Sequence, residues 1–77
     1  MADGTADITV HIDETLDHRR LEAIADLVRK SRGIASVVSH DDKPHFLLVR
    51  YDPSRVTSND IHRLVTEQGV HSEVIGL

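Results

Sequence analysis

The sequence predicts an α+β sandwich in which two helices cover one face of a four-stranded antiparallel sheet. Three observations carry this prediction. Some segments alternate apolar and polar residues, two segments have apolar residues at helical spacing, and a turn separates the second and third strand segments. The order is strand, helix, strand, strand, helix, strand. Right-handed crossovers in both halves then place the first and third strands in the centre of the sheet.

The first half of the chain holds a strand, a helix and a second strand. Ile8 to Ile12 alternates apolar and polar residues, as a strand with one buried face does. In the helix that follows, Asp17 is the predicted N-cap and Gly33 is the predicted left-handed stop. The second strand is predicted at Ile34 to His40.

The second half repeats this order after a hairpin. Asp41 to Pro44 is the predicted turn, and His45 to Tyr51 is the third strand. Thr57 is the predicted N-cap of the second helix, and Asp60 completes a capping box with it. A glycine ends this helix, and Val70 to Ile75 is the last strand.

Length and composition narrow the class of protein. We expect one domain at residues 8–77 after a disordered tail at residues 1–7. No apolar run approaches the ~20 residues that span a bilayer, and the first residues lack the pattern of a signal peptide. We therefore expect no membrane insertion and a cytoplasmic location. The net charge of −4 argues against nucleic-acid binding.

Nothing in the sequence indicates an enzyme. The chain has no cysteine nucleophile and no glycine-rich phosphate loop. No Ser-His-Asp arrangement follows from the spacing of its serines and histidines. We expect a non-catalytic protein without a cofactor.

Short motifs in both halves occur in the order and spacing of a known family. They are Ile8-Thr9-Val10, Leu21-Glu22-Ala23-Ile24, Arg32-Gly33-Ile34-Ala35-Ser36-Val37, Val49-Arg50-Tyr51-Asp52-Pro53, Val56, Asp60-Ile61, Leu64 and Gly69. On these motifs the chain resembles the heavy-metal-associated domain family from Ile8 to Ile75. The resemblance implies a ferredoxin-like fold. It also implies kinship with soluble copper or mercury carriers and with domains of metal-pumping ATPases.

The metal motif of that family is missing. The family binds metal through Met-x-Cys-x-x-Cys in the loop after the first strand. The two Cys positions of that motif fall on Asp17 and Arg20, and the Met position falls on Thr15. A guanidinium is permanently cationic and cannot ligate a metal. Asp17 is instead suited to cap the helix, and Arg20 is placed to pair with Asp17 or Glu14.

Six histidines leave a different metal site open as an alternative. His11 and His71 are predicted on neighbouring strands, and imidazole with carboxylate suits a Zn, Cu or Ni ion. No local histidine motif supports such a site, and ordinary surface histidines or pH sensing explain the same residues. The weak candidate ligands are His11, His71, His40, Asp17 and His18.

The alternation also predicts which side chains lie on the face of the sheet away from the helices. The predicted helix-facing residues are Ile8, Val10, Ile12, Val37, Leu47, Val49, Tyr51 and Val74. The predicted open-face residues are Thr9, His11, Val38, His40, Phe46, Leu48, Arg50, His71, Glu73 and Ile75. The third strand is apolar on both sides, so the reverse register, with Phe46 and Leu48 buried, stays open.

An exposed apolar patch on a small protein indicates an interaction surface. We predict that this surface comprises Val38, Phe46, Leu48, Arg50 and Ile75. The predicted function is therefore that of an interaction or regulatory module. It docks to a protein partner or to a second copy through the open face. The alternative is a metal carrier with histidine and carboxylate ligands.

Overall fold

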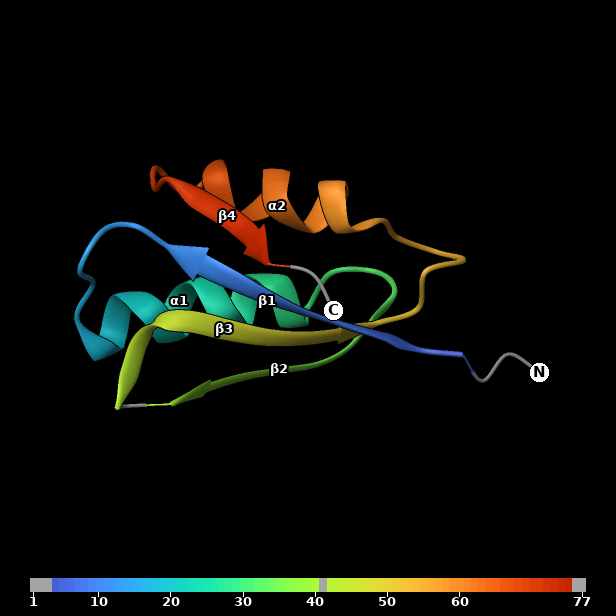
Figure 1. Cartoon of the computed structure of the whole chain (residues 1–77), viewed down its shortest axis with the longest axis horizontal. Coiled ribbons are helices and arrows are strands. Elements are labelled where there is room, and N and C mark those ends of the chain that lie inside the picture. The colour runs from blue at the N-terminus through green and yellow to red at the C-terminus, as the bar shows by residue number, and fades with distance from the viewer. Residues whose placement is uncertain (1–3, 41, 76–77) are drawn as a thin grey trace.

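The computed structural model describes residues 4–40 and 42–75. Its elements are β1 (Ala6–Ile12), α1 (His18–Arg29), β2 (Ile34–His40), β3 (Lys43–Tyr51), α2 (Ser58–Thr66) and β4 (Ser72–Ile75). The strands form one antiparallel sheet in the order β2-β3-β1-β4, with β3 and β1 in the centre. In Figure 1 the strands follow one another in this order from bottom to top, with α1 behind β1 and β3 and α2 beside β4. The predicted fold class and strand order are confirmed.

The core lies between the sheet and the two helices. The largest side chains below 2% exposure come from every layer: Ile12, Leu47, Ile61, Val10, Val28, Val49 and Val65. In β3 the buried residues alternate with exposed ones, which is the strand period of two. This settles the register of β3, because Leu47 is 0% exposed and Leu48 is 44% exposed.

Both helix N-caps match the prediction. The Asp17 carboxylate accepts a hydrogen bond from the Arg20 backbone N–H at 2.8 Å. At α2, the Thr57 hydroxyl accepts from the Asp60 backbone N–H at 3.0 Å, and the Asp60 carboxylate accepts from the Thr57 backbone N–H at 3.1 Å. These bonds satisfy donors that the first turn of a helix leaves without partners.

Three predicted strand boundaries are wrong. β1 begins at Ala6, two residues before the predicted Ile8, because Ala6 pairs with Tyr51 across the sheet. β3 begins at Lys43 and so includes Pro44 from the predicted turn. Pro44 lies beyond the last paired residue of β1, where its missing N–H removes no ladder bond on that side.

The boundary of β4 matters for the candidate site. β4 begins at Ser72, so Val70 and His71 lie before the strand, although Val70 is buried.

The helices also end earlier than the glycines suggest, since α1 is capped at Lys30. Gly33 does adopt the predicted left-handed conformation, with φ of 85°.

Two predictions reach beyond the described residues. The tail prediction covers Met1 to Asp3 and the turn prediction covers Asp41, and all four lie outside the described residues. Of the remaining tail, Gly4 and Thr5 are exposed, while Ala6 and Asp7 belong to β1. Gly76 and Leu77, at the end of the predicted domain, also lie outside the described part of the chain.

Candidate interaction face

The face of the sheet away from the helices carries its residues in rows across the strands. The pairing registers give a first row of Ser36, Arg50 and Asp7, a central row of Val38, Leu48, Thr9 and Ile75, and a third row of Phe46, His11 and Glu73. Paired residues on adjacent strands point to the same side of a sheet. Each row therefore forms a continuous band of side chains.

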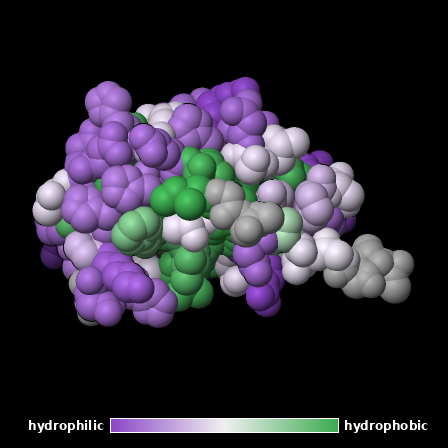
Figure 2. Space-filling model, viewed as in Figure 1, coloured by the Kyte–Doolittle hydropathy of each residue, from purple (hydrophilic) through white to green (hydrophobic). Residues whose placement is uncertain are grey.

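The central row is the apolar part of this face. Val38, Leu48 and Ile75 are 42%, 44% and 47% exposed, and they are the exposed large apolar residues of the described chain. Figure 2 shows a hydrophobic area that crosses the middle of this face, with hydrophilic residues on both sides. Phe46 is more covered than predicted, because the His11 ring packs edge-on against it with centroids 5.1 Å apart.

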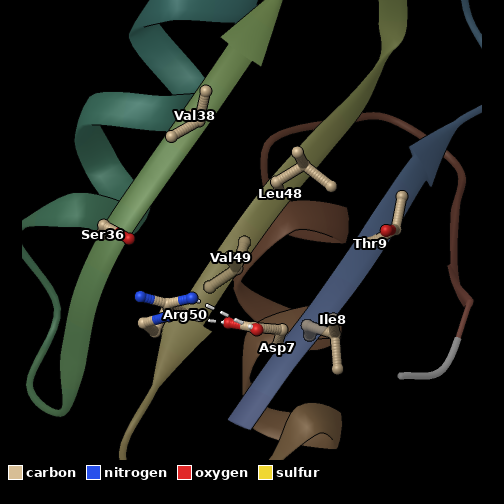
Figure 3. A pocket seen from close by; sticks show the side chains of 8 residues that line it. All are labelled: Asp7, Ile8, Thr9, Ser36, Val38, Leu48, Val49 and Arg50. Atoms are coloured by element: carbon tan, nitrogen blue, oxygen red, sulfur yellow. Dashed lines mark hydrogen bonds and ion pairs between the residues drawn. The ribbon is translucent and has the colours of Figure 1, made fainter. Parts of the chain in front are cut away.

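The first row ends in an ion pair across two strands. Arg50 Nε lies 2.9 Å from Asp7 Oδ1, and Figure 3 shows the pair beside the central row. The hydrogen bond from Arg50 holds the pKa of Asp7 below its ordinary value. Sequence reasoning assigned Asp7 to the tail and missed this pair. Asp7 nevertheless has the same parity as Thr9 and His11, so extending the alternation by two residues would have found it.

Two shallow hollows flank Leu48. One, of about 400 Å³, lies on the side of Asp7, Ser36 and Arg50. The other, also of about 400 Å³, is lined by His40, Lys43 and Phe46 among others. The cationic Lys43 therefore lies at the β2 and β3 side of this face, while Glu73 lies on β4 at the opposite edge.

The candidate metal ligands are spread over the molecule. His11 Nδ1 lies 3.2 Å from Asp13 Oδ1, and its ring stacks on that of His45, with centroids 5.7 Å apart. His40 is exposed on β2, Asp17 caps α1, and His18 is the first residue of that helix. Among residues 4–40 and 42–75, no three His, Cys, Asp or Glu side chains form a group that could hold a metal ion.

His71 does not adjoin His11 as predicted. The strand partner of His11 is Glu73, and His71 lies in the loop before β4. There, His71 Nδ1 is 2.7 Å from Glu14 Oε2, and its backbone N–H donates to Glu14 Oε1 at 2.8 Å. The hydrogen bond raises the pKa of His71, and the same contacts lower the pKa of Glu14.

The loop after β1 is therefore tied to the loop before β4. The Asp13 backbone N–H donates to the His71 carbonyl at 2.8 Å, in addition to the Glu14 contacts. The Arg20 guanidinium donates to the Gln68 carbonyl at the end of α2. The predicted pairing of the Arg20 side chain with Asp17 or Glu14 is not what the structure records. The actual acceptor is 48 residues away, so no local pattern could have indicated it.

Several solved structures share this fold. A candidate copper-ion-binding protein from Bacillus anthracis matches with a TM-score of 0.82 and 21% identity, over 92% of this chain and 99% of that one. A copper-binding domain of HMA7, a P-type ATPase, matches with a TM-score of 0.83 and 15% identity, over 92% and 95%. Oxidized MerP from Ralstonia metallidurans matches with a TM-score of 0.82 and 14% identity, over 92% and 97%.

These likenesses establish the fold. The structural neighbours bind copper or mercury, and MerP is a periplasmic protein of bacterial mercury detoxification. No protein-family model matches the chain, and no curated protein sequence does. The chain therefore has the ferredoxin-like architecture of heavy-metal-associated domains, as its motifs suggested, and it contains no cysteine.

The helices of the structure are short. None within the described residues is long and apolar enough to cross a membrane.

Proposed function

We propose that this protein is a non-catalytic docking module that binds a protein through the open face of its sheet. The observation that carries the proposal is the central row, where β2, β3 and β4 each expose one large apolar side chain and β1 contributes Thr9. Exposed apolar area that is contiguous and bordered by polar groups is typical of an interaction site. A row of this kind gives a partner an apolar centre, and the charged rows beside it supply orientation.

The loop after β1 supports a function without metal. In this chain the loop and the first turn of α1 are occupied by structural contacts: Asp17 caps α1, Arg20 donates to Gln68, and Glu14 binds His71. A carboxylate that already accepts bonds from a helix terminus is a poor free ligand, and a guanidinium is none. We propose that no cofactor is needed and that the cytoplasm is where the module works.

Site-specific photo-crosslinking tests the docking surface directly. A benzophenone amino acid replaces Leu48 in one variant and Asn59, an exposed residue at the start of α2, in a matched control. Both variants are irradiated in cells of the source organism. The proposal predicts a discrete protein adduct from position 48 that is absent from position 59. If position 48 yields no adduct beyond the control, the open face is not a docking surface.

Metal titration tests the alternative function of a histidine and carboxylate carrier. Zn(II), Ni(II) or Cu(I) is added to the protein at neutral pH, and backbone amide shifts are followed by NMR. Docking without metal predicts no saturable shift at His11, His40, His71, Asp17 or His18. Saturation at one of these groups, abolished by the His11→Ala and His71→Ala double variant, would establish the carrier function instead.

A further inference from the structure

The charges on the open face are arranged so that the face is complementary to a second copy of itself. This inference rests on the proposed function and names the occupant of the docking surface. Positive side chains on the face belong to β3, as Arg50 and Lys43, while negative ones belong to β1 and β4, as Asp7 and Glu73. The open face is thus positive along β3, which carries Arg50 and Lys43, and negative along β1 and β4, while β2 carries no Lys or Arg.

From this division of charge we propose that the partner is a second copy of this chain. The two sheets meet face to face around a two-fold axis that runs between β3 and β1, close to the strand direction. Such an axis lays β3 of one copy over β1 of the other, and β2 over β4. Each charge then meets its opposite, as electrostatic complementarity at an interface requires.

In the first row this arrangement makes an alternating square of four charges. Arg50 and Asp7 are already paired within one copy, with 2.9 Å between Nε and Oδ1. The two-fold places Arg50 of each copy over Asp7 of the other, so every charge has two opposite neighbours. A guanidinium has donors enough to bind two carboxylates at once. The pair within the monomer therefore persists in the dimer.

The central row pairs by the same operation. Val38 on β2 faces Ile75 on β4 of the second copy, and Leu48 faces Thr9. The three apolar side chains, each more than 40% exposed, are then covered. In the third row, Phe46 faces His11, while Lys43 and His40 approach Glu73. Two sheets packed in this way cross at about 30° and lie roughly 10 Å apart, as in β-sandwiches.

A two-fold axis across the strands is the competing geometry. It would lay each strand on its own copy, with Leu48 on Leu48 and Val38 on Val38. Arg50 would then face the Phe46 ring and Asp7 would face His11, so the strong opposite charges would not meet. The charges therefore favour the axis along the strands. The two axes also predict different neighbours for Val38, which an experiment can distinguish.

Cysteine cross-linking makes that distinction on a chain that has no cysteine of its own. Val38→Cys and Ile75→Cys variants are treated with a bis-maleimide of about 8 Å span, alone and mixed. The proposal predicts that the mixture gives cross-linked dimer in clear excess over either variant alone. Equal residues lie roughly 14 Å apart sideways under the proposed axis, which is three strand spacings. Asn59→Cys mixed with Val38→Cys is the matched control.

Charge reversal gives an independent readout in solution. Asp7→Lys alone makes the first row of the dimer wholly positive, and Arg50→Glu alone makes it wholly negative. Analytical ultracentrifugation should show each variant as more monomeric than the natural chain. Their equimolar mixture should associate at least ~10-fold more tightly than either variant alone, since each charge of one copy then faces an opposite charge of the other copy. Unchanged amide spectra outside the first row would show that both variants fold.

Three results would overturn the second copy as partner in this arrangement. They are cross-links between equal residues, no rescue in the mixture of charge variants, or a monomer at all concentrations. The photo-crosslink from position 48 separates this failure from that of the proposed function. An adduct with a different protein would leave the docking module intact and refute only the self-association. An adduct between two copies of the chain supports both.

Discussion

The two faces of this sheet are made by the same four strands, and consecutive residues of one strand lie on opposite faces. Leu47 is fully buried under the helices, while Leu48 is 44% exposed on the open face. The covered face packs against the two helices, whereas no element among residues 4–40 and 42–75 covers the open face. The same apolar residue type therefore contributes to stability on one side and is available for docking on the other.

The largest difference in stability is expected between two single variants, in which alanine replaces either Leu47 or Leu48. Leu47→Ala leaves a cavity in the core and should lower the free energy of unfolding by about 2–5 kcal/mol. Leu48→Ala removes exposed atoms and should change it by less than about 1 kcal/mol. Urea denaturation of dilute samples measures both. Equal losses for the two variants would contradict the assignment of the faces.

A second prediction concerns the space available at Gly33, in the turn between α1 and β2. Gly33 has φ of 85°, and a Cβ there would lie 3.0 Å from Arg55 Cβ and 3.0 Å from Val56 Cγ1. Gly33→Ala should therefore cost about 1–3 kcal/mol through backbone strain and crowding. Gly4→Ala is the matched control, because a Cβ at Gly4 meets nothing within 4 Å. Thermal unfolding of both variants measures the loss, and an equal loss in Gly4→Ala would show that it does not come from the conformation of Gly33.

A smaller loss is expected from the helix layer that covers this face. Thr57→Ala removes one half of the capping box at α2 and should cost about 1 kcal/mol. Thr5→Ala changes an exposed threonine before β1 and should be neutral. The substitution does not alter the open face, so the dimer dissociation constant of the Thr57→Ala variant should match that of the natural chain. A weaker dimer in this variant would show that the helix layer influences association at the open face, against this prediction.

The smallest effect is a pH dependence at the tied loops. The contact with Glu14 raises the pKa of His71 above its ordinary 6.5, so its stabilisation is present below that pH. It is lost as pH rises through the raised pKa. The pKa of Glu14 lies below its ordinary 4.5, so the contribution of Glu14 is present above that pH and is lost as pH falls through the lowered pKa. The stability difference between the natural chain and His71→Gln should be largest at about pH 5–6. Denaturant midpoints from pH 4 to pH 9 measure it, and a flat difference would refute the contact.

Prediction from sequence worked best where the signal lies within a few residues. The period of two identified Ile8 and Val10 as core, and the caps at Asp17 and Thr57 were correct. For Leu47 and Leu48 the sequence left both registers open, and the structure buries Leu47 and exposes Leu48. Prediction failed at strand ends, because the ends of a strand depend on what the partner strand pairs with. The open-face surface was proposed from the same alternation, and whether it binds a partner is what the cross-links will test.

The sequence by itself determined the order of the elements, the buried face of β1 and both helix N-caps, while the face of each β3 residue was decided by the structure. The features that the sequence determined depend on backbone periodicity or on bonds across three residues. Only the tertiary structure decided that Asp7 meets Arg50, that Arg20 meets Gln68 and that Glu14 meets His71. These partners are 43 to 57 residues apart in the chain. Their meeting depends on strand registers and loop paths, which no short-range pattern encodes.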